Sequence, residues 1–492
     1  MPTRRPRILL AHSYYLAHDA KQWRKMRPYP PLATLLVASV LRERGFEVEL
    51  FDAMLARSEA EFVRALDASE ASVVGILEDN FNFLTKMCTT RNREAALAMV
   101  AAARARGRRV AVNGSDATDY PGTYLAAGAH AVVVGEADAT FPELAAAWTR
   151  DPDASLDAIS GLALPAGFEP DGLPALRRTP ARAFVESLDA LPFPAWDLVD
   201  VAQYRASWTS AHGRLSWNIV TTRGCPFHCN WCAKPLYGTR YAQRSPANVA
   251  REVRYLADAV NPDHLWFADD IFGLSPRWIE SYAEALAHEN VRIPFTMQSR
   301  VDLMTPSAVA ALAHAGAEEV WMGVESGAQK ILDAMDKGTR VMQVRDATRL
   351  LRHHGIRASW FLQLGYPGET WDDILATRDL MREERPDDVG VSVAYPLPGT
   401  LFYERVKEQL GAHTNWSDSD DLAMMFHGTY EGSFYRRVRD LLHEEVAAFP
   451  ATGNAAAETE MMLDARWTEL TATEARFRAE EQAADPAGLA RA

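Results

Sequence analysis

Three cysteines stand close together near the middle of the 492-residue chain, at Cys225, Cys229 and Cys232, and a fourth, Cys88, stands alone. This spacing does not form a disulfide framework, because the cluster has no second set of partners. It suits thiolates that share a metal centre. Three thiolates are one ligand short of a closed structural zinc site or a closed iron–sulfur cluster. We therefore expect one coordination position for a ligand from outside the protein, with a zinc site completed by His228 as the alternative.

The two residues before the first cysteine suit this chemistry. Gly224 permits a tight turn in the loop, and the guanidinium of Arg223 places a positive charge that favours thiolate over thiol. The loop follows an expected strand at 218–222, so it lies at the carboxyl end of that strand. We expect the metal centre at this end.

Residues 5–150 alternate short apolar runs, rich in Val, Ile and Leu, with amphipathic helical patterns. This alternation predicts a parallel sheet with helices on both faces. The expected strands are Arg7–His12, Glu47–Phe51, Ser72–Leu77, Arg109–Asn113 and Ala131–Gly135. The expected helices are Pro31–Arg44, Glu59–Asp67, Asn92–Arg106 and Asp138–Thr149. The fold class is therefore α/β, with a doubly wound N-terminal domain of Rossmann or flavodoxin type whose ligand lies beyond the carboxyl ends of the strands.

The alternation returns with a longer period from residue 213 to about 410. Six strands are expected, at Asn218–Thr222, His264–Phe267, Phe295–Gln298, Glu319–Val324, Ser359–Leu364 and Val389–Tyr395. Six strand–helix units are too few for a closed eight-stranded barrel. The sequence therefore predicts a partial, TIM-like (β/α)6 barrel.

Domain boundaries follow from these patterns and from the prolines. Residues 1–150 form the first α/β domain, 151–212 a proline-rich linker, 213–410 the barrel, and 411–492 a helical region with a frayed tail. The linker segment Leu191-Pro-Phe-Pro-Ala-Trp196 is incompatible with a regular helix. We expect Phe193 and Trp196 to pack this segment against both neighbours.

Charge and hydropathy exclude other classes of protein. Acidic residues outnumber basic ones by 66 to 52, and the net charge of −14 argues against bulk attraction to nucleic acid. The longest apolar runs, such as 32–41, end well short of the ~20 residues that span a bilayer. We expect a cytoplasmic protein without a transmembrane segment.

The pattern Cys-x3-Cys-x-aromatic-Cys resembles that of the radical SAM superfamily, and the resemblance extends over residues 216–400. Later segments resemble the family's strand motifs in order: Phe267-Ala-Asp-Asp-Ile-Phe272, Gln298-Ser-Arg300, Gly323-Val-Glu-Ser-Gly327, Gly365-Tyr-Pro-Gly-Glu369 and Pro396-Leu-Pro-Gly-Thr400. The resemblance implies that the three cysteines hold a 4Fe-4S cluster whose fourth iron binds S-adenosylmethionine (SAM). It also implies SAM contacts from Trp231, Asp269, Asp270, Gln298, Arg300, Glu325, Ser326 and Gly365. Plainer interpretations stay open: Asp269 and Asp270 as an acidic pair at a helix start, and Glu325 as the partner of an arginine.

The order of an α/β domain, a Leu-Pro-Phe-Pro-x-Trp linker and this barrel resembles the cobalamin-binding radical SAM class. Segments 29–34, 113–118 and 134–136 correspond to those that line the corrin site in that class. The resemblance implies that cobalamin contacts come from Gly114, Ser115, Gly135 and Glu136. The Asp-x-His-x-x-Gly motif of many cobalamin proteins is absent, so a degenerate domain that binds no corrin stays open. Cys88 could approach cobalt or the substrate, although a buried structural thiol is the alternative.

The resemblance implies an enzyme that methylates an unactivated carbon or phosphorus centre of a small molecule. In that class, one SAM recharges cobalamin with a methyl group, and a second is cleaved to a 5′-deoxyadenosyl radical. The first alternative is oxidative cyclisation or rearrangement, as in the anaerobic magnesium-protoporphyrin monomethyl ester cyclase family, which segment Met425–Tyr430 resembles. The second is a non-catalytic cobalamin sensor or carrier. Methylthiolation of tRNA is disfavoured, because such enzymes use three further cysteines and a basic RNA-binding tail.

The expected partners are a small-molecule substrate and an electron donor such as flavodoxin or ferredoxin, with no nucleic acid. Several aromatic residues of the C-terminal region could cap a hydrophobic substrate or form ordinary core. They are Phe426, Tyr430, Phe434, Tyr435 and Trp467.

Overall fold

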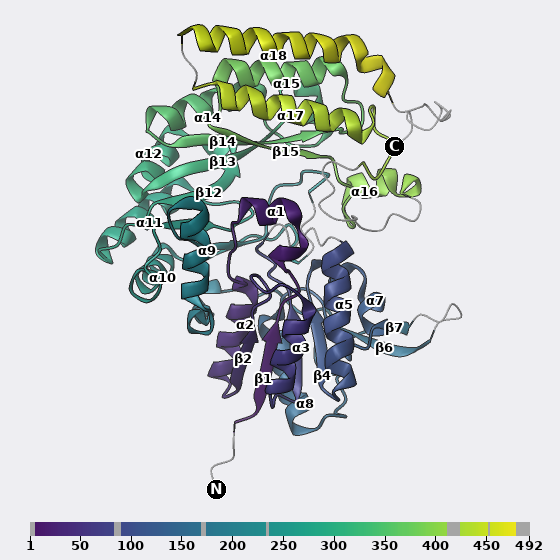
Figure 1. The fold of residues 1–492 in the computed structure, drawn as a ribbon. Coiled ribbons are helices and arrows are strands. Elements are labelled where there is room, and N and C mark those ends of the chain that lie inside the picture. The colour runs from purple at the N-terminus through teal and green to yellow at the C-terminus, as the bar shows by residue number, and fades with distance from the viewer. Residues whose placement is uncertain are drawn as a thin grey trace.

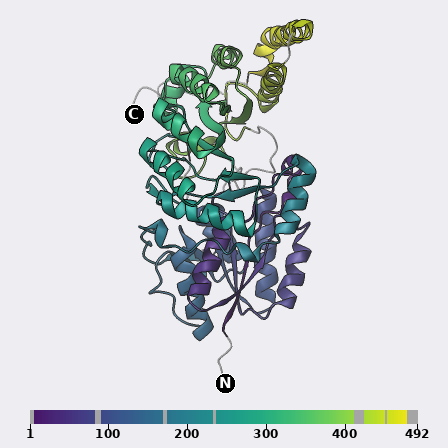
Figure 2. The same cartoon turned by 90° about the vertical axis from the view of Figure 1, so that its left-hand side faces the viewer.

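The computed structural model describes residues 5–82, 90–168, 174–232, 236–410, 424–450 and 453–478. Two α/β bodies stack end to end, with a layer of C-terminal helices beyond the second body (Figure 1). The view from the side shows the same stacking (Figure 2). Cys88 lies outside the described residues.

The first body is a seven-stranded sheet in the order β2-β1-β3-β4-β5-β6-β7. The first five strands along the chain are parallel, and their order is that of a flavodoxin-like fold. These strands are β1 (Arg7–Ala11), β2 (Glu47–Phe51), β3 (Val73–Leu77), β4 (Arg109–Asn113) and β5 (Ala131–Val133). The doubly wound domain expected from the sequence is therefore confirmed. The antiparallel strands β6 (Leu162–Phe168) and β7 (Pro174–Arg178) extend this sheet into the proline-rich segment.

Helices cover both faces of the first sheet, because its central strands β1, β3 and β4 are apolar on both sides. Helices α2 (Leu32–Glu43) and α8 (Ala137–Arg150) share one apolar core with the sheet, and α3 (Glu59–Ala68) and α5 (Thr90–Ala105) share the other. Three short helices complete the domain: α1 (Ala20–Lys25), α6 (Ser115–Asp119) and α7 (Pro121–Ala126). The carboxyl edge of the sheet stays free of these cores and faces the second body.

The second body is a six-stranded parallel sheet in the order β15-β14-β13-β12-β11-β8, which confirms the partial barrel. Its strands are β8 (Ser216–Ile219), β11 (His264–Phe267), β12 (Phe295–Arg300), β13 (Ala317–Glu325), β14 (Arg357–Leu364) and β15 (Asp388–Val393). Its helices are α10 (Pro246–Ala259), α11 (Pro276–His288), α12 (Pro306–Ala315), α13 (Gln329–Ala334), α14 (Val341–His353), α15 (Trp371–Glu384) and α16 (Leu401–Val406). A two-stranded ribbon of β9 (Thr222–Arg223) and β10 (Ala242–Gln243) follows β8.

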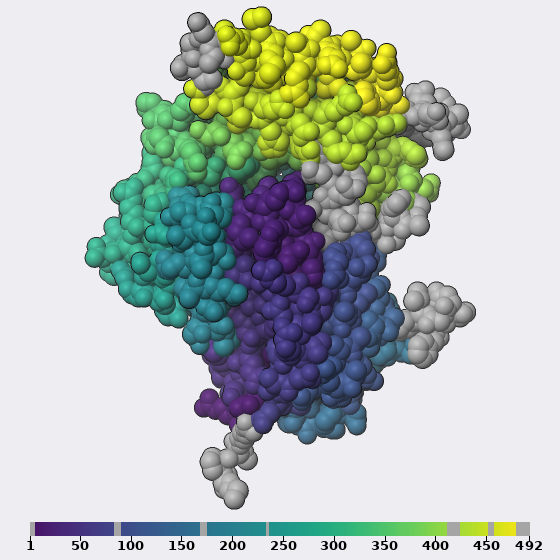
Figure 3. Space-filling model, in the orientation of Figure 1, coloured from purple at the N-terminus to yellow at the C-terminus, as the bar shows by residue number. Residues whose placement is uncertain are grey.

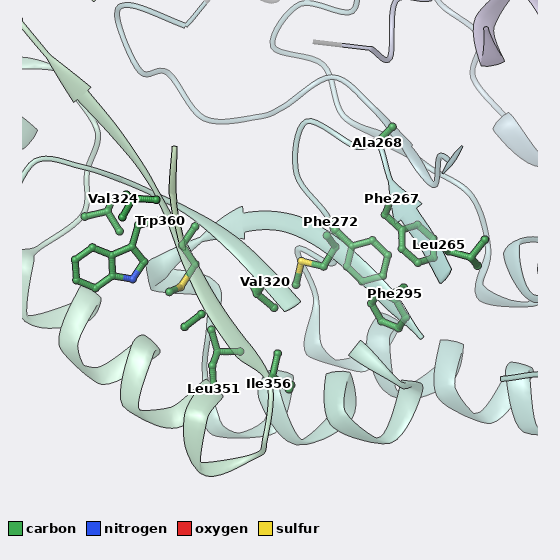
Figure 4. Packing of buried hydrophobic residues seen from close by; sticks show 14 of the residues in the cluster. Leu265, Phe267, Ala268, Phe272, Phe295, Val320, Val324, Leu351, Ile356 and Trp360 are labelled. Carbon is green, nitrogen blue, oxygen red and sulfur yellow. The ribbon is translucent and has the colours of Figure 1, made fainter. Parts of the chain in front are cut away.

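Alternate residues of the barrel strands face the surrounding helices and form the largest core. Phe267, Phe295, Val320 and Trp360 lie on this face, where they pack with Leu351 of α14 and other buried side chains (Figure 4). Because side chains alternate across a strand, the intervening positions face the barrel interior. These interior residues are largely polar and include His264, Thr296, Gln298, Glu319, Ser359 and Gln363.

The linker packs against both bodies, as the sequence predicted. The Ser39 hydroxyl of α2 donates to the Phe193 carbonyl (2.6 Å), and the Ala195 amide donates to the Leu35 carbonyl (3.1 Å). On the barrel side, the Trp196 indole donates to Glu252 of α10 (3.2 Å). Helix α9 (Val201–His212) then leads into β8.

Helices α17 (Gly432–Ala448) and α18 (Gly453–Thr473) pack beyond β15 on the far side of the barrel from the first body (Figure 1). The aromatic residues considered for a substrate cap, namely Phe426, Tyr430, Phe434, Tyr435 and Trp467, are all buried. They are therefore ordinary core. None of the helices in the described ranges is long and apolar enough to cross a membrane.

Replacement of the linker tryptophan tests the packing between the bodies. Trp196 is 1% exposed and contacts Trp217 edge to face. The Trp196→Ala variant should lose ~3–5 kcal/mol of stability, because the cavity spans the junction of the two bodies. Thermal unfolding followed by circular dichroism measures the loss. Trp23→Ala is the control, since Trp23 is 37% exposed; equal destabilisation by the two variants would contradict the assignment.

Candidate functional site

The loop that carries the three cysteines begins at a buried carboxylate. Asp269 follows β11 and accepts hydrogen bonds from the backbone amides and side-chain hydroxyls of Thr221 and Thr222, at 2.5–3.0 Å. Burial raises the pKa of Asp269 to about 7, although these hydrogen bonds oppose the shift. The carboxylate that the resemblance assigned to SAM is therefore committed to the start of the cysteine loop. The neighbouring Asp270 is exposed, and the next helix along the chain begins only at Pro276, so the helix-start interpretation is wrong.

Gly224 is required by a close approach of the backbone. Its φ is +76°, and a Cβ there would collide with the carbonyl oxygen of Arg240. A residue with a Cβ would be strained at this positive φ, and the Cβ itself would have no room beside Arg240. This confirms the expected role of Gly224 as the turn residue before Cys225.

Two cations lie beside Cys229, and neither is Arg223. Arg300, at the end of β12, places Nη1 3.7 Å from the Cys229 Sγ, and its guanidinium lies 3.8 Å from the ring centroid of Phe227. Lys337 is buried, which lowers its pKa, but Glu325 and then Cys229 raise it to a net value above normal. Arg300 and Lys337 therefore place two positive charges beside the Cys229 sulfur. The expectation that Arg223 is the cation beside the cysteines is wrong, because Arg223 points to Glu136 and Asp138 of the first body.

Glu325 and Lys337 form a buried pair at the carboxyl end of β13. The Lys337 Nζ lies 2.7 Å from the Glu325 Oε1 and 6.0 Å from the ring centroid of Trp231. Glu325 has a φ of +65°, where the register with β14 shifts. A non-glycine residue in this conformation is strained, and such strain concentrates at functional sites. The predicted residues Trp231, Arg300 and Glu325 are thus brought together beside Cys229. The partner of Glu325 is Lys337, which the sequence did not predict.

The other residues predicted for SAM have structural partners. The Gln298 amide lies 3.3 Å from the Asp269 carbonyl, to which it donates. The Ser326 hydroxyl accepts from the Ala328 amide (3.1 Å), and the Gly365 amide donates to Glu369 (2.6 Å). These contacts shape the turns after β11, β13 and β14. The period-2 pattern could have pointed to Gln363, which lies two residues before Gly365 and faces the interior.

Several buried polar atoms at this end of the barrel are without a partner among the described residues. Among them are the indole Nε1 of Trp231 and the Oε1 of Gln363. Buried polar atoms are usually hydrogen-bonded, so each unpaired atom calls for a ligand or water. Together with Glu325, they fit a ligand with both donor and acceptor groups, such as the amino acid and nucleoside parts of SAM.

The carboxyl edge of the first sheet carries a second polar group of residues. The Asn113 side chain donates to the Val133 and Gly135 carbonyls, both at 2.9 Å. Gly135 has a φ of +81° with open space beside it, whereas a Cβ at Gly114 would meet the Glu78 side chain. Polar side-chain atoms without a described partner at this edge are Asp79 Oδ2, Asn80 Oδ1, Ser115 Oγ and Thr118 Oγ1. This edge fits a polar ligand, whereas Glu136 is turned to Arg223.

The thiol donors fit an iron–sulfur cluster by their chemistry. Cys225, Cys229 and Cys232 are half-buried thiols on one loop, and His228 between them is exposed. Within the described ranges, no three His, Cys, Asp or Glu side chains gather closely enough to hold a single metal ion. The four-ligand zinc arrangement with His228 is thus not formed by these side chains.

A flavodoxin-like sheet with a polar carboxyl edge is thus docked on the cysteine loop of a partial barrel, in the domain order that the sequence predicted. Comparison with known families agrees. The radical SAM superfamily pattern matches residues 219–381, and the B12 binding domain pattern matches residues 27–145. The chain therefore carries a B12 binding domain followed by a radical SAM domain, as the sequence predicted.

Individual relatives are similar over different shares of their length. An uncharacterised methyltransferase of Pyrococcus horikoshii is 29% identical, over 58% of this chain and 60% of its own length. Cytidylyl-2-hydroxyethylphosphonate methyltransferase of Streptomyces wedmorensis is 23% identical, over 77% of this chain and 78% of its own. The structure of the radical SAM methyltransferase TsrM of Kitasatospora setae, with cobalamin and a 4Fe-4S cluster bound, superposes with a TM-score of 0.67 at 20% identity, over 84% of this chain and 76% of that one. This likeness confirms the fold.

Alanine at position 224 tests the architecture of the cysteine loop. Gly224→Ala should displace the loop from Arg240 and so abolish incorporation of iron into anaerobically reconstituted protein, measured as iron per chain. Gly238→Ala is the matched control, because Gly238 also has a positive φ (+60°) but open space at its Cβ position. Normal iron content in the Gly224→Ala protein would contradict this account of the loop.

The buried Glu369 predicts a pH effect of defined sign. Burial raises its pKa from the ordinary 4.5 to about 8. The folded protein therefore binds this proton more tightly, and the contribution of Glu369 to stability is full below pH 4.5 and is lost as the pH rises toward 8. The Glu369→Gln variant has no carboxyl group to ionise, so its stability should not fall in this way. The melting temperature of the variant minus that of the wild type should therefore rise as the pH increases from 4.5 to about 8. Exposed Glu280→Gln is the control; a constant difference between Glu369→Gln and wild type would disprove the prediction.

Proposed function

We propose that this protein is a cobalamin-dependent radical SAM enzyme that methylates an unactivated carbon or phosphorus centre of a small molecule. The observation that carries the proposal is the contact between the cysteine loop and the carboxyl edge of the B12-binding domain, made by Arg223 with Glu136 and Asp138. The two cofactor sites implied by the family thus lie on facing edges. When bound, the cluster supplies the electron that cleaves SAM, and cobalamin supplies the methyl group.

In this proposal, Cys225, Cys229 and Cys232 bind three irons and leave the fourth for SAM. Arg300 and Lys337 stabilise the negative charge of the thiolates. Glu325, Trp231 and Gln363 orient SAM at the carboxyl ends of the barrel strands. Their buried positions exclude water from the reacting groups.

Residues of the first body would hold the corrin. Asn80, Ser115 and Thr118 offer their unpaired oxygen atoms to the polar groups of the ligand. Gly135 lets the ligand approach the backbone, whereas the space beside Gly114 is filled by the Glu78 side chain. Asp269 and Glu136 do not contact a cofactor in this proposal. Asp269 holds the start of the cysteine loop, and Glu136 holds Arg223.

The proposed partners are a small-molecule substrate and a one-electron donor such as flavodoxin or ferredoxin. A thiolate-bound cluster that must be reduced suits the reducing cytoplasm. The barrel interior, with half-exposed Trp266, Trp321 and Phe361, gives an aromatic surface for part of the substrate. Because the net charge is −14, we expect no nucleic acid among the partners.

Anaerobic reconstitution with iron, sulfide and hydroxocobalamin tests the proposal. We expect the spectra of a 4Fe-4S cluster and of bound cobalamin. With dithionite and SAM, we expect 5′-deoxyadenosine from reductive cleavage and S-adenosylhomocysteine from methyl donation, both measured by mass spectrometry. Cys229→Ala should lose the cluster and the 5′-deoxyadenosine. His228→Ala, the control within the same loop, should keep both because His228 is exposed.

Other outcomes would select the alternatives. Zinc that is lost in His228→Ala would favour the four-ligand metal site. Formation of 5′-deoxyadenosine without S-adenosylhomocysteine would favour cyclisation or rearrangement. Bound cobalamin without any cleavage of SAM would favour a sensor or carrier.

A further inference from the structure

Arg223 connects the cysteine loop to the first body through a buried ion cluster. Its Nη1 lies 2.7 Å from the Glu136 Oε1 and 2.7 Å from the Asp138 Oδ2, and its Nη2 lies 3.1 Å from the Asp138 Oδ1. The guanidinium also lies over the rings of Phe81 and Tyr237, at 5.8 and 5.5 Å from their centroids. The ion cluster and its ring contacts therefore join four segments: the turn after β5, the segment after β3 that carries Phe81, the start of the cysteine loop and the chain near 237.

The charges of this cluster are almost completely hidden from water. The side chains of Arg223, Glu136 and Asp138 are 5%, 6% and 8% exposed. Burial of a charge is costly unless it is paired and hydrogen-bonded. Arg223 meets this condition through the carboxylates of the first body, so the docked arrangement is the one in which its charge is satisfied.

The position of Arg223 gives this contact a consequence for chemistry. It lies two residues before Cys225 and one residue before Gly224, whose backbone packs on Arg240. Glu136 and Asp138 lie at the carboxyl edge of the first sheet, where they line a small cavity with Asn80 and Asn113. A shift of this ion cluster would therefore move the first cysteine relative to the proposed corrin site.

Other contacts between the two bodies are made elsewhere. Tyr29 meets the Ser216 hydroxyl (2.9 Å), and the Asn218 amide donates to the Pro30 carbonyl (2.9 Å). Both contacts involve β8, before the cysteine loop begins. The space-filling view shows the purple N-terminal segment seated against the barrel (Figure 3). These contacts attach the bodies, whereas the Arg223 cluster attaches the loop.

We propose that Arg223, Glu136 and Asp138 form a positioning latch that fixes the cysteine loop at one place relative to the corrin. This inference depends on the proposed function, because it requires that both cofactors bind, but it does not depend on which substrate is used. Rigid placement matters because group transfer loses rate steeply, by about a hundredfold for a shift of ~1 Å.

The distance between the two metal centres tests the latch directly. A reduced 4Fe-4S cluster and cob(II)alamin each carry an unpaired electron, so pulsed electron paramagnetic resonance reports their separation. The reconstituted wild type should give one narrow distance distribution. The triple variant Arg223→Met, Glu136→Gln, Asp138→Asn should lose this single narrow distribution.

The triple variant is chosen so that folding is kept. It replaces the ion cluster by neutral side chains of similar size, and such replacements are often tolerated because no unpaired charge remains. Arg223→Lys is the conservative variant; it keeps the charge but loses the two-pronged contact, so it should broaden the distribution less. Circular dichroism and melting temperature verify the fold of each protein.

A second, partly buried ion pair provides the matched control. Arg382 of α15 and Glu445 of α17 are 26% and 5% exposed, and they lie on the far side of the barrel from the first body. Arg382→Met with Glu445→Gln should leave the distance distribution unchanged. An unchanged distribution in the folded triple variant would overturn the latch, as would equal broadening in the control. Absence of either signal from the wild type would instead count against the proposed function.

Discussion

The position of the cysteine loop depends on two buried charged residues, one on each side of the loop. Asp269 binds the start of the loop from within the barrel, and Arg223 binds the carboxylates of the first body. Neither charge could be buried alone, because desolvation costs several kcal/mol per ion. The loop therefore reaches its position when the barrel and the B12-binding domain are docked.

The two faces of the barrel sheet have separate tasks. The outward face packs aromatic and aliphatic side chains against the helices, and this packing makes the sheet rigid. The inward face carries polar residues and, at Glu325, a strained backbone conformation. The rigid face supports the strain of the polar one, which is how a residue such as Glu325 can be held beside Lys337 and Cys229.

Fold and site carry different information about function. The fold is shared with TsrM at 20% sequence identity, so the architecture alone does not choose among reactions. Under the proposed function, the residues that distinguish one reaction from another are the cations beside Cys229, the unpaired oxygen atoms of the first sheet edge and the aromatic residues of the barrel interior. The C-terminal aromatic residues are not among them, because they are buried in the core.

The sequence by itself determined the two α/β bodies, the six barrel strands, the packing of Phe193 and Trp196, and the family. These features follow from periodicity, proline and local spacing, which are properties of neighbouring residues. It did not determine the partners of charged groups. Asp269 could be expected at a ligand and Arg223 at a thiolate, yet Asp269 binds Thr221 and Thr222, and Arg223 binds Glu136 and Asp138, about 85 residues earlier in the chain. Only the tertiary structure decided these pairings, because a buried charge takes whichever opposite charge or donor the docked chain places within reach.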